Sequence, residues 1–430
     1  MEAIPHDAAL LLPEGTRLLH IGPPKTGTTS LQSALFAARP ALLAQGVRHA
    51  GRARNAASAA QAITGRSSMF IGGEVPPISR WERLVHEVQH APEPRVIISS
   101  EFFADAQPEA IRRIVDALDP DRIHVAVTVR PLASILTSQW AQYVADGMGA
   151  PFNSWLEAML TPGNQRFSPS FWVRHRHDEL VDRWAAVVGP QRVTVILVDS
   201  ERGAVLRGFE RLLGLTPGTL VADPDLANRS LTLPETEAVR AFNVQFKRAG
   251  LPRPLLSRVM HFGATRAMKR RAPDPAWPTI ELPAWALPEV GRLAREIADG
   301  IARSGVRVVG DLDGLARVPD PPAHDAPRVV PAPPQVAAAM AMGVLFATGT
   351  ARSGVDAGAE TREAELERVP TYVLGGAVVM RTLRGAGRRI GSLRGGRHGR
   401  RAQAAGTKAS SDQAVATPPD GHGDAYGRPQ

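Results

Sequence analysis

A stretch rich in glycine and hydroxyl residues, HIGPPKTGTTSLQSAL (residues 20–35), has the composition of a loop that binds an anion. Gly22 and Gly27 keep the glycine spacing of the triphosphate-binding loop G-x-x-x-x-G-K-[ST]. However, Thr28 follows Gly27, and the lysine of this stretch, Lys25, lies two residues earlier. Because a glycine-rich turn that enters a helix directs backbone N–H groups and the helix dipole at an anion, the stretch predicts a phosphate-binding loop.

The side chains around the second glycine indicate which phosphate group this loop binds. Four of them add hydroxyl donors, namely Thr26, Thr28, Thr29 and Ser30. Pro23 and Pro24 stiffen the first half of the loop, so we expect Lys25 at its rim rather than at the start of the helix. The Lys-Ser/Thr pair that triphosphate enzymes place beside magnesium is missing. The layout favours a terminal monophosphate, with Lys25 free to reach the next group of the ligand.

Two further polar positions follow apolar runs of the sequence. The run VIISSE (residues 96–101) ends in Glu101, and the run VTVRP (residues 127–131) contains Arg130, with Ser138 eight residues later. A guanidinium group can hold a phosphate bidentately. A partly desolvated carboxylate can accept a proton near neutral pH. Since ligands of α/β proteins bind at the carboxyl ends of parallel strands, these groups are expected beside the loop.

The elements that must position these groups alternate along the chain. Apolar runs predict strands at Thr16–Gly22, Arg95–Phe103, Arg122–Pro131 and Arg192–Asp199. Amphipathic patterns predict helices at Thr28–Arg39 (ended by Pro40), Trp81–Ala91, Pro108–Asp119, Leu132–Asp146 and Asp178–Gly189. Residues 50–80 read as a loop with weak helix. The alternation predicts an α/β fold with a central parallel β-sheet flanked by helices on both faces, similar to that of P-loop nucleotide triphosphatases.

Composition changes at about residue 315. Residues 1–315 form the expected α/β domain, residues 316–335 a proline-rich linker, and residues 336–430 a basic, low-complexity, mostly disordered tail. Short helices are expected within this tail at Val336–Gly349 and Glu360–Arg384. The net charge is +9, of which residues 376–430 contribute +7 (ten Lys/Arg and three Asp). Nucleic acid is therefore not an expected partner of the folded part.

The cellular compartment is predicted from the absence of cysteine, of a signal-peptide pattern and of a long apolar segment. There is no cysteine, which excludes disulfides and thiolate metal sites and suits a reducing compartment. The N-terminus does not have the pattern of a signal peptide, and the longest apolar segment, Val336–Ala347, is too short to span a bilayer. We expect a cytoplasmic protein, with peripheral membrane contact through the basic tail as an open possibility. The sequence does not indicate an oligomeric state.

The stretch GPPKTGTTSLQ closely resembles the 5′-phosphosulfate loop of sulfotransferases that use 3′-phosphoadenosine 5′-phosphosulfate. The strand ending in Arg130, with Ser138 eight residues later, is similar to the element with which this family binds the 3′-phosphate. Residues 178–200 and Asn228–Asn243 are similar to later family segments, so the resemblance covers roughly residues 15–260.

The resemblance implies in-line transfer of a sulfuryl group to a hydroxyl of a carbohydrate, glycolipid or small molecule, with no metal required. It implies that Pro24, Lys25, Thr26, Gly27, Thr28, Thr29 and Ser30 bind the donor, together with Arg130 and Ser138. Lys25 is the expected cation at the bridging oxygen of the leaving group.

The general base is less well defined by the sequence. Some branches of this family use a histidine and others a glutamate; Glu101 is the favoured candidate because it ends a strand at the edge where the loop lies. His20, just before the loop, is expected to support it from outside the site, and His124 is expected in the core. The HRHD stretch at residues 175–178 is interpreted as solvated rather than as a metal site. The family's catalytic-histidine motif is not visible, so the base stays open between Glu101 and a histidine.

The acceptor site is expected among residues 50–80, 140–175 and 240–280. These offer aromatic surfaces at Phe70, Trp81, Trp140, Tyr143, Phe152, Trp155, Phe167, Phe171 and Trp172. The basic segment Arg258–Asp274 could help to hold the nucleotide or an acidic acceptor, or form a solvated face. Two other hypotheses stay open: a magnesium-dependent P-loop kinase or triphosphatase, and a non-catalytic adaptor whose basic tail binds anionic lipid or nucleic acid.

Overall fold

The computed structural model describes residues 10–67, 73–164, 166–198, 203–222, 229–321 and 332–348. All of them belong to one compact unit, and a second unit, residues 358–430, lies outside the described part of the chain. The tail beyond residue 348 and the helix expected at Glu360–Arg384 therefore cannot be compared with the structure. Among the described residues, no helix is long and apolar enough to cross a membrane.

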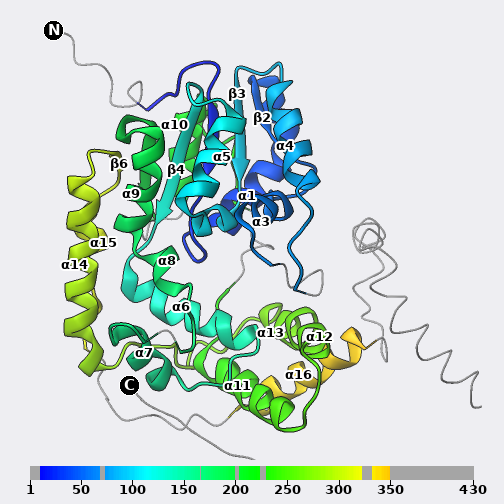
Figure 1. The fold of residues 1–430 in the computed structure, drawn as a ribbon. Coiled ribbons are helices and arrows are strands. Elements are labelled where there is room, and N and C mark those ends of the chain that lie inside the picture. Colours follow the sequence, from blue (N-terminus) through cyan, green and yellow to red (C-terminus); the bar gives the residue numbers. More distant parts are fainter. Residues whose placement is uncertain are drawn as a thin grey trace, which may run out of the picture. The chain divides into compact units, whose positions relative to one another are not determined.

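Six parallel strands form one sheet, which confirms the predicted fold class (Figure 1). Their order is β2-β3-β1-β4-β5-β6, so the first strand lies at the centre of the sheet. The strands are β1 Arg17–His20, β2 Val47–His49, β3 Arg95–Ser99, β4 Ile123–Val129, β5 Val193–Leu197 and β6 Arg307–Val309. The chain leaves β1 toward β2 and later crosses to β4 on the other side of β1. Such a reversal opens a crevice at the carboxyl ends of β1 and β4, where ligands bind in this class of fold.

The central strands are buried and mostly apolar because both faces of the sheet are covered. Leu18 packs into one hydrophobic core and Leu19 into a second core on the opposite face. On β3, Ile97 packs into the same core as Leu18, and the residues on either side of it pack into the other core. Ala126 and its neighbours on β4 are divided in the same way. Successive side chains of a strand point to opposite faces of the sheet, so both sets must be apolar where both faces are covered.

The helices around the sheet have the following bounds: α1 Thr28–Ala37, α2 Arg39–Ala44, α3 Ala57–Thr64, α4 Ser79–Gln89, η2 Glu101–Asp105, α5 Pro108–Leu118, α6 Leu132–Ala145, α9 His177–Val188, η3 Pro190–Arg192, α10 Ala204–Leu213, α14 Leu287–Arg303 and α15 Leu312–Leu315. Helices α1 and α10 cover one face of the sheet, and α5 and α9 belong to the core of the other face.

A smaller group of helices lies beyond the carboxyl edge of the sheet (Figure 1). It comprises α7 Phe152–Leu160, α8 Phe171–His175, α11 Leu233–Arg248, α12 Arg253–Leu256, the π-helix η4 Ser257–Ala264, α13 Thr265–Lys269, η5 Ala284–Ala286 and α16 Pro334–Ala347. Helix α16 packs against η4 and α13, and its Val336 is fully buried. This helix therefore belongs to the folded unit, although the predicted domain boundary was residue 315.

The predicted strands and helices differ from the observed ones in a few places. The strand predicted at Arg95–Phe103 ends at Ser99, because a 3₁₀ turn starts at Glu101. Pro40 was expected to mark the end of the first helix. It lies instead in the first turn of α2, where a backbone N–H would have no partner within the helix. Strands β2 and β6 were not predicted, since three residues at a sheet edge are too short for a periodic pattern.

Candidate active site

The loop after β1 turns into α1 through two residues with left-handed backbone angles. Lys25 has a φ of 73° and Gly27 a φ of 80°. Glycine adopts such angles freely, but they are uncommon for a residue with a side chain. Gly27 is the N-cap of α1, so the first backbone N–H groups of the helix open toward the loop. The backbone arrangement expected of an anion-binding loop is therefore present.

A buried chain of hydrogen bonds holds this loop from below. The ring of His20 contacts Ser99 Oγ at 2.8 Å through Nδ1 and Thr128 Oγ1 at 3.1 Å through Nε2. Thr26 Oγ1 lies 2.8 Å from Thr128 Oγ1 and donates to the carbonyl of Pro23 at 2.7 Å. The chain thus links strands β3, β1 and β4 to the loop. Burial lowers the pKa of His20 to about 3, so the ring is neutral and acts as a support, as predicted.

Gly22 is required by this buried chain rather than by its backbone angles. A Cβ atom at this position would lie 1.8 Å from Thr128 Oγ1 and 2.6 Å from His20 Nε2. Any side chain would therefore displace the two residues that support the loop. The first glycine of the motif provides space for a hydrogen-bonded support, and the second, Gly27, provides a backbone angle.

The loop lines a cavity of about 2300 Å³. Small-molecule sites commonly occupy about 300–1000 Å³, so this cavity has room for a nucleotide and a second ligand. Most of the site residues predicted from the sequence line it, namely Pro24, Lys25, Gly27, Thr28, Thr29, Ser30, Glu101 and Arg130. Thr26 is the exception in the loop, because it is buried and its hydroxyl donates to the loop itself. Ser138 lines a smaller adjoining pocket together with Lys25.

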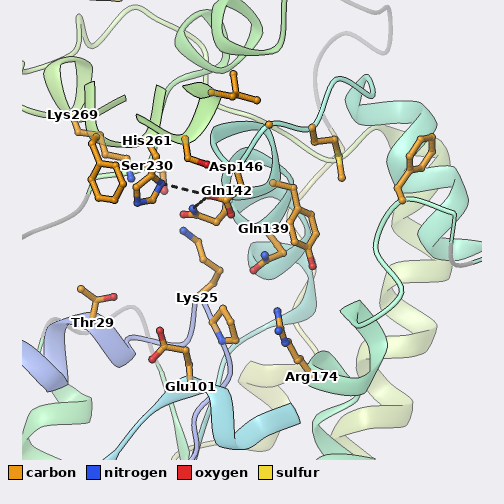
Figure 2. Close-up of a pocket in the computed structure, with 18 of the residues that line it drawn as sticks. Lys25, Thr29, Glu101, Gln139, Gln142, Asp146, Arg174, Ser230, His261 and Lys269 are labelled. Carbon is orange, nitrogen blue, oxygen red and sulfur yellow. Dashed lines mark hydrogen bonds and ion pairs between the residues drawn. The ribbon is translucent and has the colours of Figure 1, made fainter. Parts of the chain in front are cut away.

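Lys25 points from the loop toward the middle of the cavity (Figure 2). Its pKa is lowered to about 8, chiefly by desolvation and also by the positive charges of Lys269 and Arg130. The negative charge of Asp146 acts in the opposite direction. The ammonium group is thus still protonated at neutral pH, but its charged form is less stable here than in water. An anion in the cavity would offset that loss of stability, so the site favours a negatively charged ligand.

Arg130 ties the end of β4 to the loop. Its Nη1 donates to the backbone carbonyl of Lys25 at 3.4 Å, and the side chain is half-buried in the cavity wall. On α6, Ser138 donates to the carbonyl of Ser134 at 2.7 Å, as hydroxyls within helices commonly do. The structure brings Arg130 beside Lys25 in the larger cavity and Ser138 beside Lys25 in the smaller one.

Glu101 lies at the start of η2, next to the loop, and lines the same cavity (Figure 2). Its Oε2 accepts a hydrogen bond from Gln32 Nε2 at 3.1 Å, and Gln32 in turn accepts one from Asn55 at 3.2 Å. One oxygen of the carboxylate is thereby oriented by α1. Glu101 is half-buried, within reach of solvent and of a ligand.

The wall opposite the loop carries polar residues that the sequence did not single out individually. Asp146 at the end of α6 accepts a hydrogen bond from Gln142 at 3.1 Å, and its Oδ1 lies 3.6 Å from Nδ1 of His261 (Figure 2). Lys269 completes this group, and burial lowers its pKa. His261 sits on the π-helix η4, a geometry frequent at functional sites. The basic segment Arg258–Asp274 thus supplies His261 and Lys269 to the cavity.

The cavity lining is strongly cationic. Its lysines and arginines are Lys25, Arg54, Arg66, Arg130, Arg166, Arg174, Arg229, Lys247, Arg248, Arg253 and Lys269, against Glu101 and Asp146 as the two acids. Some of this charge is neutralised from behind, since Arg174 and Arg66 pair with Asp105 and Arg229 pairs with Glu235. The remaining excess still gives the cavity a positive field that attracts anions.

The other histidines and the aromatic residues are placed mostly in the core. His124 is buried and bonds Thr194 Oγ1 at 2.8 Å, as expected of a core residue. The interpretation of HRHD as solvated was wrong, because His175 and His177 are both buried. Of the nine aromatic residues expected near the acceptor, Tyr143 and Phe167 line the cavity. Trp81, Trp140, Trp155 and Phe171 are core residues, and Phe70 lies outside the described residues.

Within the described ranges, no three histidine or acidic side chains are grouped as metal ligands.

Comparison with known proteins adds a likeness to solved structures and no family. No protein-family model and no curated protein matches the chain. One similar solved structure is a sulfotransferase from Alicyclobacillus acidocaldarius, with 18% sequence identity and a TM-score of 0.37. The likeness covers 57% of this chain and 96% of that one. At this level of similarity we draw no functional argument from it, and the site geometry has to carry the function.

Proposed function

We propose that this protein is a sulfotransferase that uses 3′-phosphoadenosine 5′-phosphosulfate and a hydroxyl acceptor. The observation that carries the proposal is the position of Lys25. Its side chain enters a large cationic cavity from an anion-binding loop, beside Arg130 and without the Lys-Ser/Thr pair of triphosphate enzymes. The sequence resemblance of the loop supports the same donor.

The residues present fit such a donor. The N-terminal amides of α1, with the hydroxyls of Thr28 and Thr29, would hold its 5′-phosphate. Arg130, with Ser138 on the next helix, would hold its 3′-phosphate. When bound, the donor supplies an activated sulfuryl group that passes to the acceptor hydroxyl.

Lys25 and Glu101 would perform the chemistry from the chain's side. Lys25, whose side chain points into the cavity, would place a positive charge where negative charge grows on the departing oxygen. Glu101, held through Gln32, accepts the proton that the acceptor hydroxyl loses. Binding both ligands in one cavity supplies the remaining rate enhancement through orientation.

The test is calorimetric titration of the full chain, without magnesium, with adenosine 3′,5′-bisphosphate, 5′-AMP and ATP. We expect the bisphosphate to bind at least about tenfold more tightly than 5′-AMP, since a phosphate on a guanidinium contributes about that factor. Equal binding of the two would refute the 3′-phosphate site. A preference for ATP that appears on addition of magnesium would instead establish a kinase or triphosphatase.

A further inference from the structure

Helix α16 presents an apolar face to solvent. Its sequence, PQVAAAMAMGVLFA, contains no charged residue. Val336, Ala339 and Gly343 pack inward. The opposite side of the helix is exposed and entirely apolar: Ala337, Ala338, Ala341, Met342 and Leu345. These positions recur every three or four residues, so they form one continuous stripe. Because the outer side of a surface helix ordinarily carries polar and charged residues, the stripe is a candidate contact surface.

Exposed apolar side chains of the neighbouring elements extend this stripe. Helix α16 packs on η4, and η4 packs on α12. Phe262 of η4 is exposed, as are Leu251 and Leu255, which lie just before α12 and within it. Together with Met342 and Leu345, they make up five of the twelve exposed large apolar side chains of the described residues. We call these five side chains the α12–α16 surface. They belong to the group of helices beyond the carboxyl edge of the sheet (Figure 1).

The crossing of α16 over η4 joins the parts of this surface. A Cβ atom on Gly343 would lie 2.6 Å from the backbone N and Cα of Ala264, so the two helices touch through their backbones. Phe262 and Met342 each adjoin a glycine of this crossing, and both of their side chains are exposed. The surface is therefore held by close helix packing.

The charge of this region has one sign. Residues 238–273 contain nine lysines and arginines and no aspartate or glutamate. Two of these arginines reach the ends of α16. Arg258 donates to the carbonyl of Ala347 at 2.9 Å, and Arg271 donates to the carbonyl of Gln335 at 2.8 Å. The apolar stripe is thus bordered by a cation at each end.

We propose that the α12–α16 surface binds the face of an anionic lipid bilayer. Apolar side chains bordered by arginine and lysine suit the boundary between acyl chains and anionic headgroups, since the apolar groups enter the bilayer and the cations meet the phosphates. A second copy of this chain fits less well. A two-fold interface would place the same nine cations against themselves, and like charges oppose association.

This contact lies in the folded unit and is distinct from any contact made by the basic tail. It is also independent of sulfuryl transfer, because binding a bilayer requires no donor and no acceptor. Met342 and Leu345 do not line the cavity, so they can be changed without touching the proposed donor site.

The first experiment uses the absence of cysteine, which allows one introduced cysteine to carry a single environment-sensitive fluorophore. The test position is Met342→Cys, and the matched control is Leu43→Cys on α2, since the two side chains are 44% and 46% exposed. Both full-length proteins are labelled with nitrobenzoxadiazole. They are mixed with vesicles of phosphatidylcholine alone or of an equimolar mixture with phosphatidylglycerol. The Met342→Cys label should shift its emission to the blue with the anionic vesicles only, and the Leu43→Cys label should not respond.

The second experiment measures vesicle affinity by co-sedimentation. The test variant is Met342→Gln/Leu345→Gln, and the control is Leu43→Gln/Val221→Gln, which also replaces two exposed apolar side chains. We expect the test variant to bind the anionic vesicles about tenfold more weakly than the control, because two side chains no longer enter the bilayer. Both variants keep the basic tail, so the tail's own attraction for anions cancels. Their thermal midpoints should match.

Several results would overturn the proposal. Equal vesicle affinity of the test and control variants would assign the binding to the basic tail. A Met342→Cys label that is already shielded without vesicles, and does not respond to them, would show that another part of the chain covers the surface. Absence of vesicle binding by the wild type would also overturn it. If the wild type is then a dimer that the test variant loses, the surface binds a second copy. In each case the binding of adenosine 3′,5′-bisphosphate remains a separate question.

Discussion

The guanidinium of Arg130 donates to the backbone carbonyl of Lys25 at 3.4 Å, so the end of β4 and the loop after β1 are one unit. The residue proposed to bind the 3′-phosphate therefore also steadies the residue proposed to act on the departing oxygen. If the two proposed roles are correct, this contact couples donor binding to catalysis across the central strands of the sheet.

Replacing Arg130 should chiefly weaken the binding of adenosine 3′,5′-bisphosphate. Arg130→Ala removes a bidentate phosphate donor, and we expect adenosine 3′,5′-bisphosphate to bind about ten- to a hundredfold more weakly. Arg130→Lys should recover part of the loss, because it keeps the charge without the planar fork. Affinity for 5′-AMP is the internal control and should change little. An unchanged bisphosphate affinity in Arg130→Ala would contradict the assignment.

The protonation of Lys25 should make donor binding depend on pH. Desolvation and the nearby cations lower the pKa of this lysine to about 8, so the free protein loses the charge as the pH rises through that value. We expect bisphosphate affinity to fall above about pH 8, by at most tenfold per pH unit. Calorimetry between pH 7.5 and 9.5 measures this, and Lys25→Met should flatten the dependence. A wild-type affinity constant over this range would show that Lys25 does not contact the ligand.

Lys25 should also make the stability of the free protein depend on pH, and stability should rise with pH where bisphosphate affinity falls. Its folded-state pKa is below the ordinary value of 10.5, so the unfolded chain holds the proton more tightly between about pH 8 and 10.5. Stability therefore rises with pH over that window. Lys25→Met should unfold at a higher denaturant concentration than the wild type at pH 7, and the difference should shrink toward pH 10.5.

His20 should matter for stability and, through the loop, for binding. His20→Ala removes the ring that Ser99 and Thr128 contact, although Thr128 keeps its contact with Thr26, and we expect a loss of about 2–4 kcal/mol in the free energy of unfolding. His86→Ala, at an exposed position of α4, is the control and should cost little. Because the folded pKa of His20 is about 3, the wild type should lose stability as the pH falls from about 6.5 toward 3. Equal denaturation midpoints for both variants would contradict the supporting role.

Glu101 and His261 can be separated as candidate bases once an acceptor is in hand. Glu101→Gln keeps an oxygen to accept from Gln32 but cannot take up a proton, so turnover should fall about 10²- to 10⁴-fold with unchanged bisphosphate affinity. His261→Asn tests the opposite wall, where Nδ1 lies 3.6 Å from Asp146. A large loss of turnover in His261→Asn together with a small one in Glu101→Gln would move the base to η4.

Much of the sheet could be predicted from the sequence, because nearly uninterrupted apolar runs mark strands that are covered on both faces. The loop was predictable for a different reason, since its function depends on residues adjacent in the chain. For the wall opposite it, the sequence indicated the segment Arg258–Asp274 but not the individual residues. Asp146, His261 and Lys269 come from three separate elements, and only the packing of α6 against the later helices brings them together. Their individual patterns resemble those of any solvated helix.

Helix α16 crosses η4 with almost no space between the backbones. A Cβ atom on Gly343 would lie 2.6 Å from the backbone N and Cα of Ala264, and one on Gly263 would lie 2.6 Å from the carbonyl oxygen of Gly343. The π-helix that carries His261 is therefore fixed in place by a segment roughly eighty residues further along the chain. During synthesis, the loop, Glu101 and Arg130 emerge from the ribosome long before this segment does. A nascent or proteolysed chain that stops before α16 would have its first wall complete while the second lacked its support, so formation of the whole cavity depends on residues 334–347.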